Sequence, residues 1–208
     1  PRHRFWTVRS KQTVIATGAL ERHIAFGNND RPGIMSANAG RAYLNRYGVL
    51  PGKEIIIATN NDSAYESALE LAKAGANVRL IDNRTMTPEL RNDCGVSVKV
   101  DAAPVNAYGT KGIHGLETSA SDGIENCDLL LVSGGWSPVV HLLSHCGVKL
   151  IWDQYIACFV PANTDAPLHV AGSAAGIWNS EDCETSGRAA GVAAAKALGK
   201  SGINIQLP

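Results

Sequence analysis

Short apolar runs alternate with stretches of helical spacing along the chain. The runs are bounded by turn residues, as expected of buried strands, and fall at Gln12–Ala16, Lys53–Ala58, Asn77–Ile81, Val96–Val100, Asp128–Val132 and Leu168–Ala171. Helices are predicted between them at Ile34–Tyr47, Ala64–Ala74, Pro88–Cys94, Val139–His145 and Glu181–Leu198. This alternation predicts an α/β fold with a mainly parallel sheet.

Two further pairs of short segments indicate antiparallel structure. Val105–Tyr108 and Gly115–Ser119 flank a glycine-containing turn, which predicts a hairpin. Lys149–Trp152 and Ala157–Phe159 are predicted as short strands. The class is therefore α/β with an added antiparallel element.

Composition narrows the class of protein. Apolar residues make up 45% of the 208 residues and charged residues 18%, which is typical of a globular chain. The formal net charge is zero, so we expect neither nucleic acid nor an acidic membrane as a partner. The apolar runs fall far short of the roughly 20 residues of a membrane span.

The five cysteines include no C-x-x-C pair, so neither a redox dithiol nor a zinc site is predicted. Free thiols in a reducing cytoplasm are the expectation. The chain begins without Met and soon enters a predicted strand, and we interpret it as a fragment of a longer protein.

The segment Ile55–Asp82 has the outline of a dinucleotide-binding βαβ unit. The three glycine positions of the usual fingerprint fall at Thr59, Asn61 and Ala64. Ala64 permits close packing of helix on strand. The side chains of Thr59 and Asn61, however, take up space where phosphate oxygens would lie.

Two acids complete this unit. Asp62, which with Ser63 is a candidate N-cap, puts a negative charge where a phosphate would bind, whereas Asp82 stands where a ribose partner belongs. The segment is thus either a structural or interaction element or an atypical nucleotide site, and the first interpretation is favoured.

Flanking motifs resemble those of flavoproteins with two dinucleotide-binding domains. Lys11–Ala19 (KQTVIATGA) is similar to the segment that closes their first domain, and Leu168–Gly176 (LHVAGSAAG) is similar to the strand that returns to it. A more specific resemblance, to the α subunit of heterotetrameric sarcosine oxidase, extends from about Phe5 to Leu198. It rests on ERHIAFGNNDRPGIM, RAYLNRYGVLPGK, TNNDSAY and SGGWSPVVHLLSH.

The resemblance implies a Rossmann-like, three-layer FAD/NAD(P)-binding fold in a cytoplasmic complex. Such complexes oxidise sarcosine to glycine with formation of hydrogen peroxide, and tetrahydrofolate accepts the one-carbon unit. The family places NAD in the α subunit, FMN at the α/β boundary and FAD on the β subunit. The implied partners are the β, γ and δ subunits, and no catalytic residue is expected in this fragment.

The same resemblance implies where NAD is held. The return strand of flavin-binding relatives ends in Gly-Asp, and Ser173 stands here in place of the acid, which fits a dinucleotide other than a flavin. The predicted cofactor-binding residues are Thr17, Gly18, Gly172, Ser173, Trp178 and Ser180. The alternative interpretation is a small-residue turn before a closely packed helix.

Other polar groups are weaker candidates. His141 and His145 have i, i+4 spacing but lack a third ligand, so no metal site is predicted. Trp136 is interpreted as a packing aromatic more readily than as a ligand contact. The polar loop Asn28–Arg31 is interpreted as a turn before a helix, with a partner or cofactor edge as the alternative.

These observations predict three parts of the chain. Residues 1–47 are expected to form part of a first, NAD-holding domain, residues 48–150 a second NAD-type domain, and residues 151–208 the return segment of the first. Three rival functions stay open: an NAD(P)H-dependent flavin or disulfide reductase, the α subunit of an opine or other amine oxidase, and a subunit-interaction module without a ligand.

Overall fold

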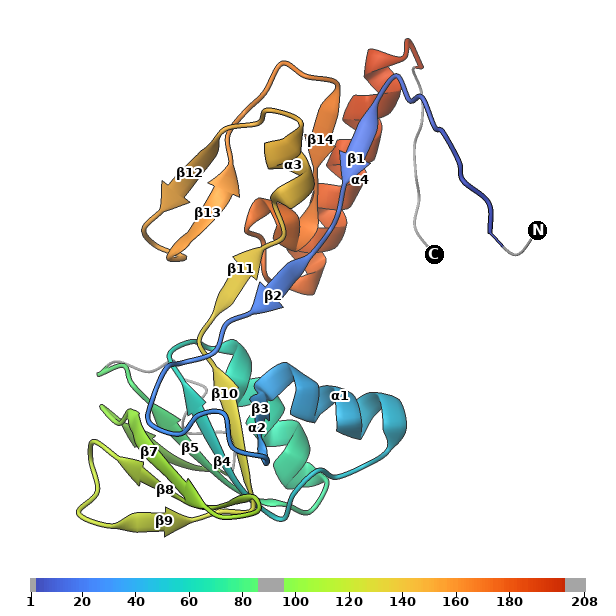
Figure 1. Ribbon diagram of the computed structural model, residues 1–208. Helices are drawn as coiled ribbons and strands as arrows, with labels where there is room; N and C mark the ends of the chain where they lie inside the picture. The colour runs from blue at the N-terminus through green and yellow to red at the C-terminus, as the bar shows by residue number, and fades with distance from the viewer. Residues whose placement is uncertain (1–2, 86–95, 201–208) are drawn as a thin grey trace. The chain divides into compact units, whose positions relative to one another are not determined.

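The computed structural model describes residues 3–85 and 96–200 (Figure 1). The chain divides into two compact units. Unit 1 comprises Pro1–Leu20 and Trp136–Pro208, and unit 2 comprises Glu21–Gly135. The predicted helix Pro88–Cys94 lies outside the described residues.

Unit 2 is built on a five-stranded parallel sheet. The strand order is β3 (Ile34–Ser36), β10 (Leu129–Ser133), β4 (Glu54–Thr59), β5 (Asn77–Asp82) and β6 (Ser97–Val100). Strands β10 and β4 are covered on both faces, so they are nearly continuous apolar runs and do not alternate in polarity. The predicted α/β class with a parallel sheet is confirmed.

Alternate residues of β4 enter two different cores. Ile55 and Ile57 pack with helix residues such as Tyr65 and Leu71, on the face covered by α1 (Ala37–Tyr47) and α2 (Ser63–Lys73). Ile56 packs on the other face, beneath the antiparallel sheet of β7 (Pro104–Gly109), β8 (Ile113–Thr118) and β9 (Ile124–Asn126). Three layers result, as Figure 1 shows.

Helix α1 corrects one sequence prediction. The helix predicted from Ile34 begins only at Ala37, because residues 34–36 form β3 and pair in register with β10. Ser36 is the N-cap, and its hydroxyl oxygen accepts a hydrogen bond from the Ala39 N–H at 3.2 Å. Gly48 ends the helix in the left-handed conformation.

The antiparallel elements agree with the sequence in part. The hairpin of β7 and β8 and the antiparallel pair of β12 (Leu150–Asp153) and β13 (Cys158–Pro161) confirm the two predicted pairs. Strand β9 was not predicted, because three residues are too few to show a period.

Unit 1 contains a second, smaller core. Strands β1 (Thr13–Ile15) and β14 (Leu168–Val170) pair in parallel, and Ile15, Leu143 and Val148 are buried beside them. Besides β12 and β13, this unit contains β11 (Trp136–Pro138), α3 (His141–His145), the 3-10 helix η2 (Gly172–Ala175) and α4 (Ser180–Ala197). Strand β11 pairs with β2 (Ala19–Glu21), whose last residue belongs to unit 2.

The boundaries between the compact units follow Leu20 and Gly135. The expected division at 47/48 and 150/151 stays a prediction. Helix α1 packs on α2 and β10, which places residues 21–47 with unit 2. Residues 136–150 contribute Leu143 and Val148 to the core of unit 1. Among the described residues, no helix has the length and apolar character needed to span a bilayer.

The core of unit 2 gives a direct stability test. Ile57→Ala removes a fully buried side chain of β4 and should lower the free energy of unfolding by about 2–5 kcal/mol. The matched control Ile124→Ala acts on a half-exposed residue of β9 and should cost about 1 kcal/mol or less. Urea unfolding followed by circular dichroism measures both, and equal losses would contradict the assignment of the core.

Candidate dinucleotide-binding site

The ends of β1 and β14 bring together two segments that are far apart in the sequence. The strands are parallel, with Ile15 opposite Val170, and the Ala171 N–H donates to the Ile15 carbonyl at 3.0 Å. Both segments therefore leave the sheet at the same edge, where Gly18 follows β1 and Ser173 follows β14. A Cβ added to Gly18 would lie 4.0 Å from the Ser173 hydroxyl oxygen.

Two glycines shape this edge. Gly18 has φ +78° and Gly172 has φ +65°, a conformation in which other residues are strained. The Gly172 N–H donates to the Ser186 hydroxyl of α4 at 3.2 Å, which ties the turn to the helix. Thr17 is anchored separately, since its hydroxyl donates to the Val139 carbonyl at 2.6 Å.

The structure places four of the six predicted cofactor-binding residues at this strand edge. Thr17, Gly18, Gly172 and Ser173 lie at the shared strand edge. Trp178 and Ser180 are exposed residues farther along, where α4 begins, and within the described part of the chain no side-chain hydrogen bond links them to the other four. Cofactor binding by all six stays a prediction.

In unit 2, side chains fill the turn of the degenerate fingerprint. Thr59 and Ser133 stand opposite each other at the ends of β4 and β10. The Asn61 amide nitrogen donates to the carbonyl and to the hydroxyl of Ser133, at 3.0 and 3.1 Å. The Asn61 amide oxygen accepts from the N–H and hydroxyl of Ser63, at 3.2 and 2.6 Å. Asn61 thus bridges two strand ends and the start of α2.

Asp62 does not play the expected capping role. It occupies the N-cap position of α2, but its side chain makes no capping hydrogen bond. Its carboxylate instead pairs with the Arg84 guanidinium at 2.7 Å. Asn61 supplies the side-chain oxygen that holds the helix start.

Asp82 is fully buried at the end of β5 and is enclosed by donors. Its carboxylate accepts from the Tyr65 hydroxyl at 2.9 Å, from the Arg84 backbone N–H at 2.9 Å and from the Arg84 guanidinium at 2.8 and 3.0 Å. The buried carboxylate therefore has a hydrogen-bonded cation as its partner.

This network displaces two pKa values. Burial, and then the hydrogen bond to Asp82, raise the pKa of the Tyr65 hydroxyl well above its ordinary value of 10. The hydrogen bond to Asp82 is the main cause of a raised Arg84 pKa. Neither residue was singled out in the sequence, where the only signal was a cation two positions after Asp82.

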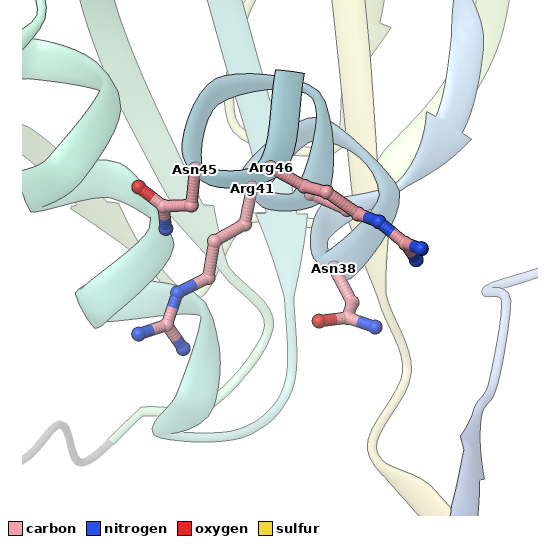
Figure 2. Close-up of a pocket in the computed structure, with 5 residues that line it drawn as sticks. Asn38, Arg41, Asn45 and Arg46 are labelled. Carbon is pink, nitrogen blue, oxygen red and sulfur yellow. The ribbon is translucent and has the colours of Figure 1, made fainter. Parts of the chain in front are cut away.

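A shallow depression lies on the surface of α1. It has a volume of about 520 Å³ and is lined by Asn38, Arg41, Ala42, Asn45 and Arg46 (Figure 2). Glu70 of α2 binds both Arg41 and Asn45, at 2.7 and 2.6 Å, and so neutralises the cation. These contacts join α1 to α2.

The remaining candidates have structural contacts. In the polar loop, Arg31 donates to the carbonyls of Ala107 and Gly109, and Asn28 donates to Asn106, so the loop is tied to β7. It leads into β3, not directly into a helix. Within residues 3–85 and 96–200, no group of three metal-ligating side chains occurs, so His141 and His145 gain no third partner.

The chain is similar in sequence to subunits of known oxidases. No protein-family model matches the chain. The α subunit of sarcosine oxidase from Corynebacterium sp. strain P-1 is 42% identical over 212 residues, covering 95% of this chain and 22% of that protein. That of Rhizobium meliloti strain 1021 is 37% identical over 204 residues, covering 96% and 20%. The chain thus spans about a fifth of these relatives, and the resemblance seen in the sequence is confirmed.

Weaker similarity extends to opine oxidases. One of the subunits of opine oxidase from Agrobacterium tumefaciens strain Ach5 is 25% identical over 219 residues, covering 90% of this chain and 44% of that protein.

Solved structures confirm the Rossmann-like fold of FAD/NAD-linked oxidoreductases. L-proline dehydrogenase from P. horikoshii has a TM-score of 0.74 at 22% identity, covering 92% of this chain and 36% of that one. Lactococcus lactis thioredoxin reductase has a TM-score of 0.72 at 18% identity, covering 91% and 66%. An FAD-dependent pyridine nucleotide-disulphide oxidoreductase from Desulfovibrio vulgaris has a TM-score of 0.64 at 17% identity, covering 91% and 55%.

Asp82 and Asp62 both form ion pairs with Arg84, so each can serve as the control for the other. Asp82→Asn breaks a buried ion pair and should lower the free energy of unfolding by about 3 kcal/mol. Asp62→Asn removes an exposed carboxylate from the same Arg84 and should cost less than about 1 kcal/mol. Urea unfolding measures both, and a larger loss for Asp62→Asn would contradict the network.

Tyr65 predicts a loss of stability in alkali. Its pKa is raised in the folded state, so only the unfolded state releases this proton just above pH 10, and the free energy of unfolding should fall as the pH rises from there. Below pH 10 this contribution is fully present. Urea unfolding of the wild type and Tyr65→Phe across that range measures it. A slope with pH that is no shallower in Tyr65→Phe would contradict the assignment.

Proposed function

We propose that this chain, a homologue of one segment of the sarcosine oxidase α subunits, forms a dinucleotide-binding part of such a protein. Similarity over 95% of the chain at 42% identity supports the kind of subunit. The convergence of Gly18 and Ser173 at the ends of β1 and β14 supports the location of the ligand. This convergence is the structural observation that carries the proposal.

The edge of unit 1 fits part of a dinucleotide. Gly18 and Gly172 lack side chains, so their backbone can approach a phosphate or ribose closely. The Ser173 hydroxyl can donate to a ligand oxygen and brings no negative charge to a phosphate. NAD is the proposed ligand, with Thr17, Trp178 and Ser180 completing this side of the site. The proposal concerns the binding of NAD and does not require that NAD is oxidised or reduced there.

The activity belongs to the complete assembly in this proposal. Sarcosine is oxidised to glycine while oxygen is reduced to hydrogen peroxide, and the methyl carbon passes to tetrahydrofolate. FAD and FMN, held mainly through the β subunit, supply the redox chemistry. This chain contributes structure and part of a nucleotide site, alongside β, γ and δ subunits in the cytoplasm. The relatives from sarcosine oxidase and opine oxidase are each named as one subunit of their enzyme, which supports a multi-subunit assembly.

The division of the chain supports the same proposal. Unit 1 would be part of the first, NAD-holding domain, and unit 2 the second domain of NAD type. Among the described residues, unit 1 has a two-stranded parallel pair at the proposed site, and it would offer one side of a ligand pocket. The pyrophosphate grip would come from another part of the α subunit.

Three rival functions make different demands. A self-sufficient NAD(P)H-dependent reductase needs a nicotinamide site and an electron acceptor, and it should consume NADH steadily when an acceptor dye is added. A ligand-free interaction module should capture a β subunit but release no nucleotide on denaturation. An opine oxidase differs in substrate, which assays of the intact complex with sarcosine and with opines distinguish.

The proposal predicts that this chain alone binds NAD weakly, whereas a complete α subunit containing it retains the nucleotide. Calorimetry on the chain and chromatography of nucleotide released from the denatured subunit measure the two. Micromolar affinity of the chain alone for NAD would contradict the proposal that it forms only one side of the pocket.

Ser173 provides the matched variant in the complete subunit. Ser173→Asp places a carboxylate beside the proposed phosphate or ribose and should weaken NAD binding roughly tenfold or more, equivalent to about 1.4 kcal/mol. Ser144→Asp adds the same charge on an exposed position of α3 and should leave binding unchanged. Equal NAD retention by both variants would remove Ser173 from the site.

A further inference from the structure

The carboxyl edge of the unit 2 sheet is where its fold would place a nucleotide. From β4 the chain proceeds to β5 on one side, while β10 pairs on the other side, so the strand order reverses between β4 and β10. Ligands of open α/β sheets bind at such a reversal. One fold relative is described as a pyridine nucleotide-disulphide oxidoreductase, so a nicotinamide dinucleotide is the ligand that this edge must be tested against.

We infer that this edge of unit 2 is closed to dinucleotides, because Asn61 and Arg84 make the contacts that a diphosphate and a ribose would otherwise make. The chain therefore carries an internal substitute for a ligand in unit 2. This inference concerns unit 2 alone and does not depend on the nucleotide proposed for unit 1.

Asn61 occupies the reversal point itself. Its amide bridges the end of β10, through the Ser133 carbonyl and hydroxyl, to Ser63 at the start of α2. In a dinucleotide fingerprint a glycine at this place lets the backbone approach the pyrophosphate. Here the space next to the turn holds a hydrogen-bonded side chain.

Four backbone donors around the turn already have partners. The Asn60 N–H donates to the Ser133 carbonyl at 3.3 Å, and the Asn61 N–H donates to the Thr59 hydroxyl at 3.1 Å. The Ser63 N–H donates to the Asn61 side chain, and the Tyr65 N–H donates to the Asp62 carbonyl. Phosphate binding at a helix start requires free N–H groups, and these four are engaged.

The ribose position is closed in the same way. A carboxylate offers about four acceptor sites, and Asp82 receives four hydrogen bonds of 3.0 Å or shorter from Tyr65 and Arg84. A ribose hydroxyl would have to displace one of these donors. Displacing the Arg84 guanidinium would leave a buried carboxylate without its cation, which is costly.

Charge adds to the steric argument. The Asp62 carboxylate is the acidic group nearest the N-terminus of α2, and it is more than half exposed. A diphosphate approaching the helix start would meet this negative charge. Arg84 does not offer a compensating site for phosphate, because its guanidinium already binds both Asp62 and Asp82.

Amide spectroscopy of the whole chain tests the closure. NADH and NADPH are titrated to millimolar concentration into isotope-labelled protein, and the resonances of Asn60, Asn61, Ser63 and Ser133 are followed. We expect no saturable shift at these four residues. A saturable shift there would overturn the inference, whereas shifts confined to Gly18, Gly172 and Ser173 would uphold it and also support the site in unit 1. An absence of shifts everywhere would uphold the closure and count only against the site in unit 1.

Variants of two neighbouring asparagines test whether the side chain of Asn61 stabilises the strand edge of unit 2. Asn61→Asp keeps the shape but removes the two N–H donors to Ser133, and it should lower the melting temperature of unit 2 by several degrees. Asn60→Asp changes an exposed side chain that Asn61 uses only as an oxygen acceptor, and it should leave the melting temperature nearly unchanged.

The same melting experiment is repeated with NADPH. A true site would be stabilised by its ligand in proportion to the logarithm of ligand concentration. We expect no such rise for unit 2 in the wild type. A rise in the wild type that Asn61→Asp abolishes, or equal melting temperatures for the two asparagine variants, would overturn the inference.

Discussion

Asp82 sets the constraint on which unit 2 depends. A carboxylate with no exposed surface must be paired and hydrogen-bonded, and Asp82 lies at the buried end of β5. Tyr65 from α2 and Arg84 from the turn after β5 supply the donors. Because Arg84 also binds Asp62, the same cation ties the end of β5 to the start of α2. The turn, the helix and the sheet are thus fixed by one charged group.

The strand edges of the two units differ in the side chains that occupy them. In unit 2, polar side chains satisfy one another and occupy the turn, so the edge is complete without a ligand. In unit 1, glycines and a serine meet at the corresponding edge, and small residues leave the backbone accessible. In the proposals above, the edge of unit 2 is an internal joint and the edge of unit 1 is one side of a binding surface.

The sequence predicted what depends on local pattern. Apolar runs located β4, β5 and β10, because strands buried on both faces are nearly continuous in apolar residues. Thr59 and Asn61 already indicated a filled turn. Strand β3 was missed, since its existence depends on pairing with the distant strand β10. Strand β9 pairs with its neighbour β8 and was missed because Ile124 is its one apolar residue.

The partners in the candidate sites were harder to foresee. Asn61 contacts Ser133 across 72 residues, and Tyr65 reaches Asp82 from a position that reads as ordinary helix. Only the registers of β10 on β4 and of β5 on β4 bring these groups together. The meeting of Gly18 and Ser173 was expected from a resemblance, whereas the placement of Trp178 and Ser180 depends on a loop whose path no periodicity encodes.

The segments by which the chain enters and leaves unit 2 are hydrogen-bonded to each other. The Arg22 N–H donates to the Gly135 carbonyl at 2.8 Å, and the Gly134 N–H donates to the Arg22 carbonyl at 2.7 Å. Its first and last residues are therefore neighbours, and the unit is an insertion with a closed stem. Such a stem lets a body of this size be excised, exchanged or circularly permuted while the host chain continues across a short gap. Evolution can remodel an inserted module of this kind without redrawing the fold that receives it.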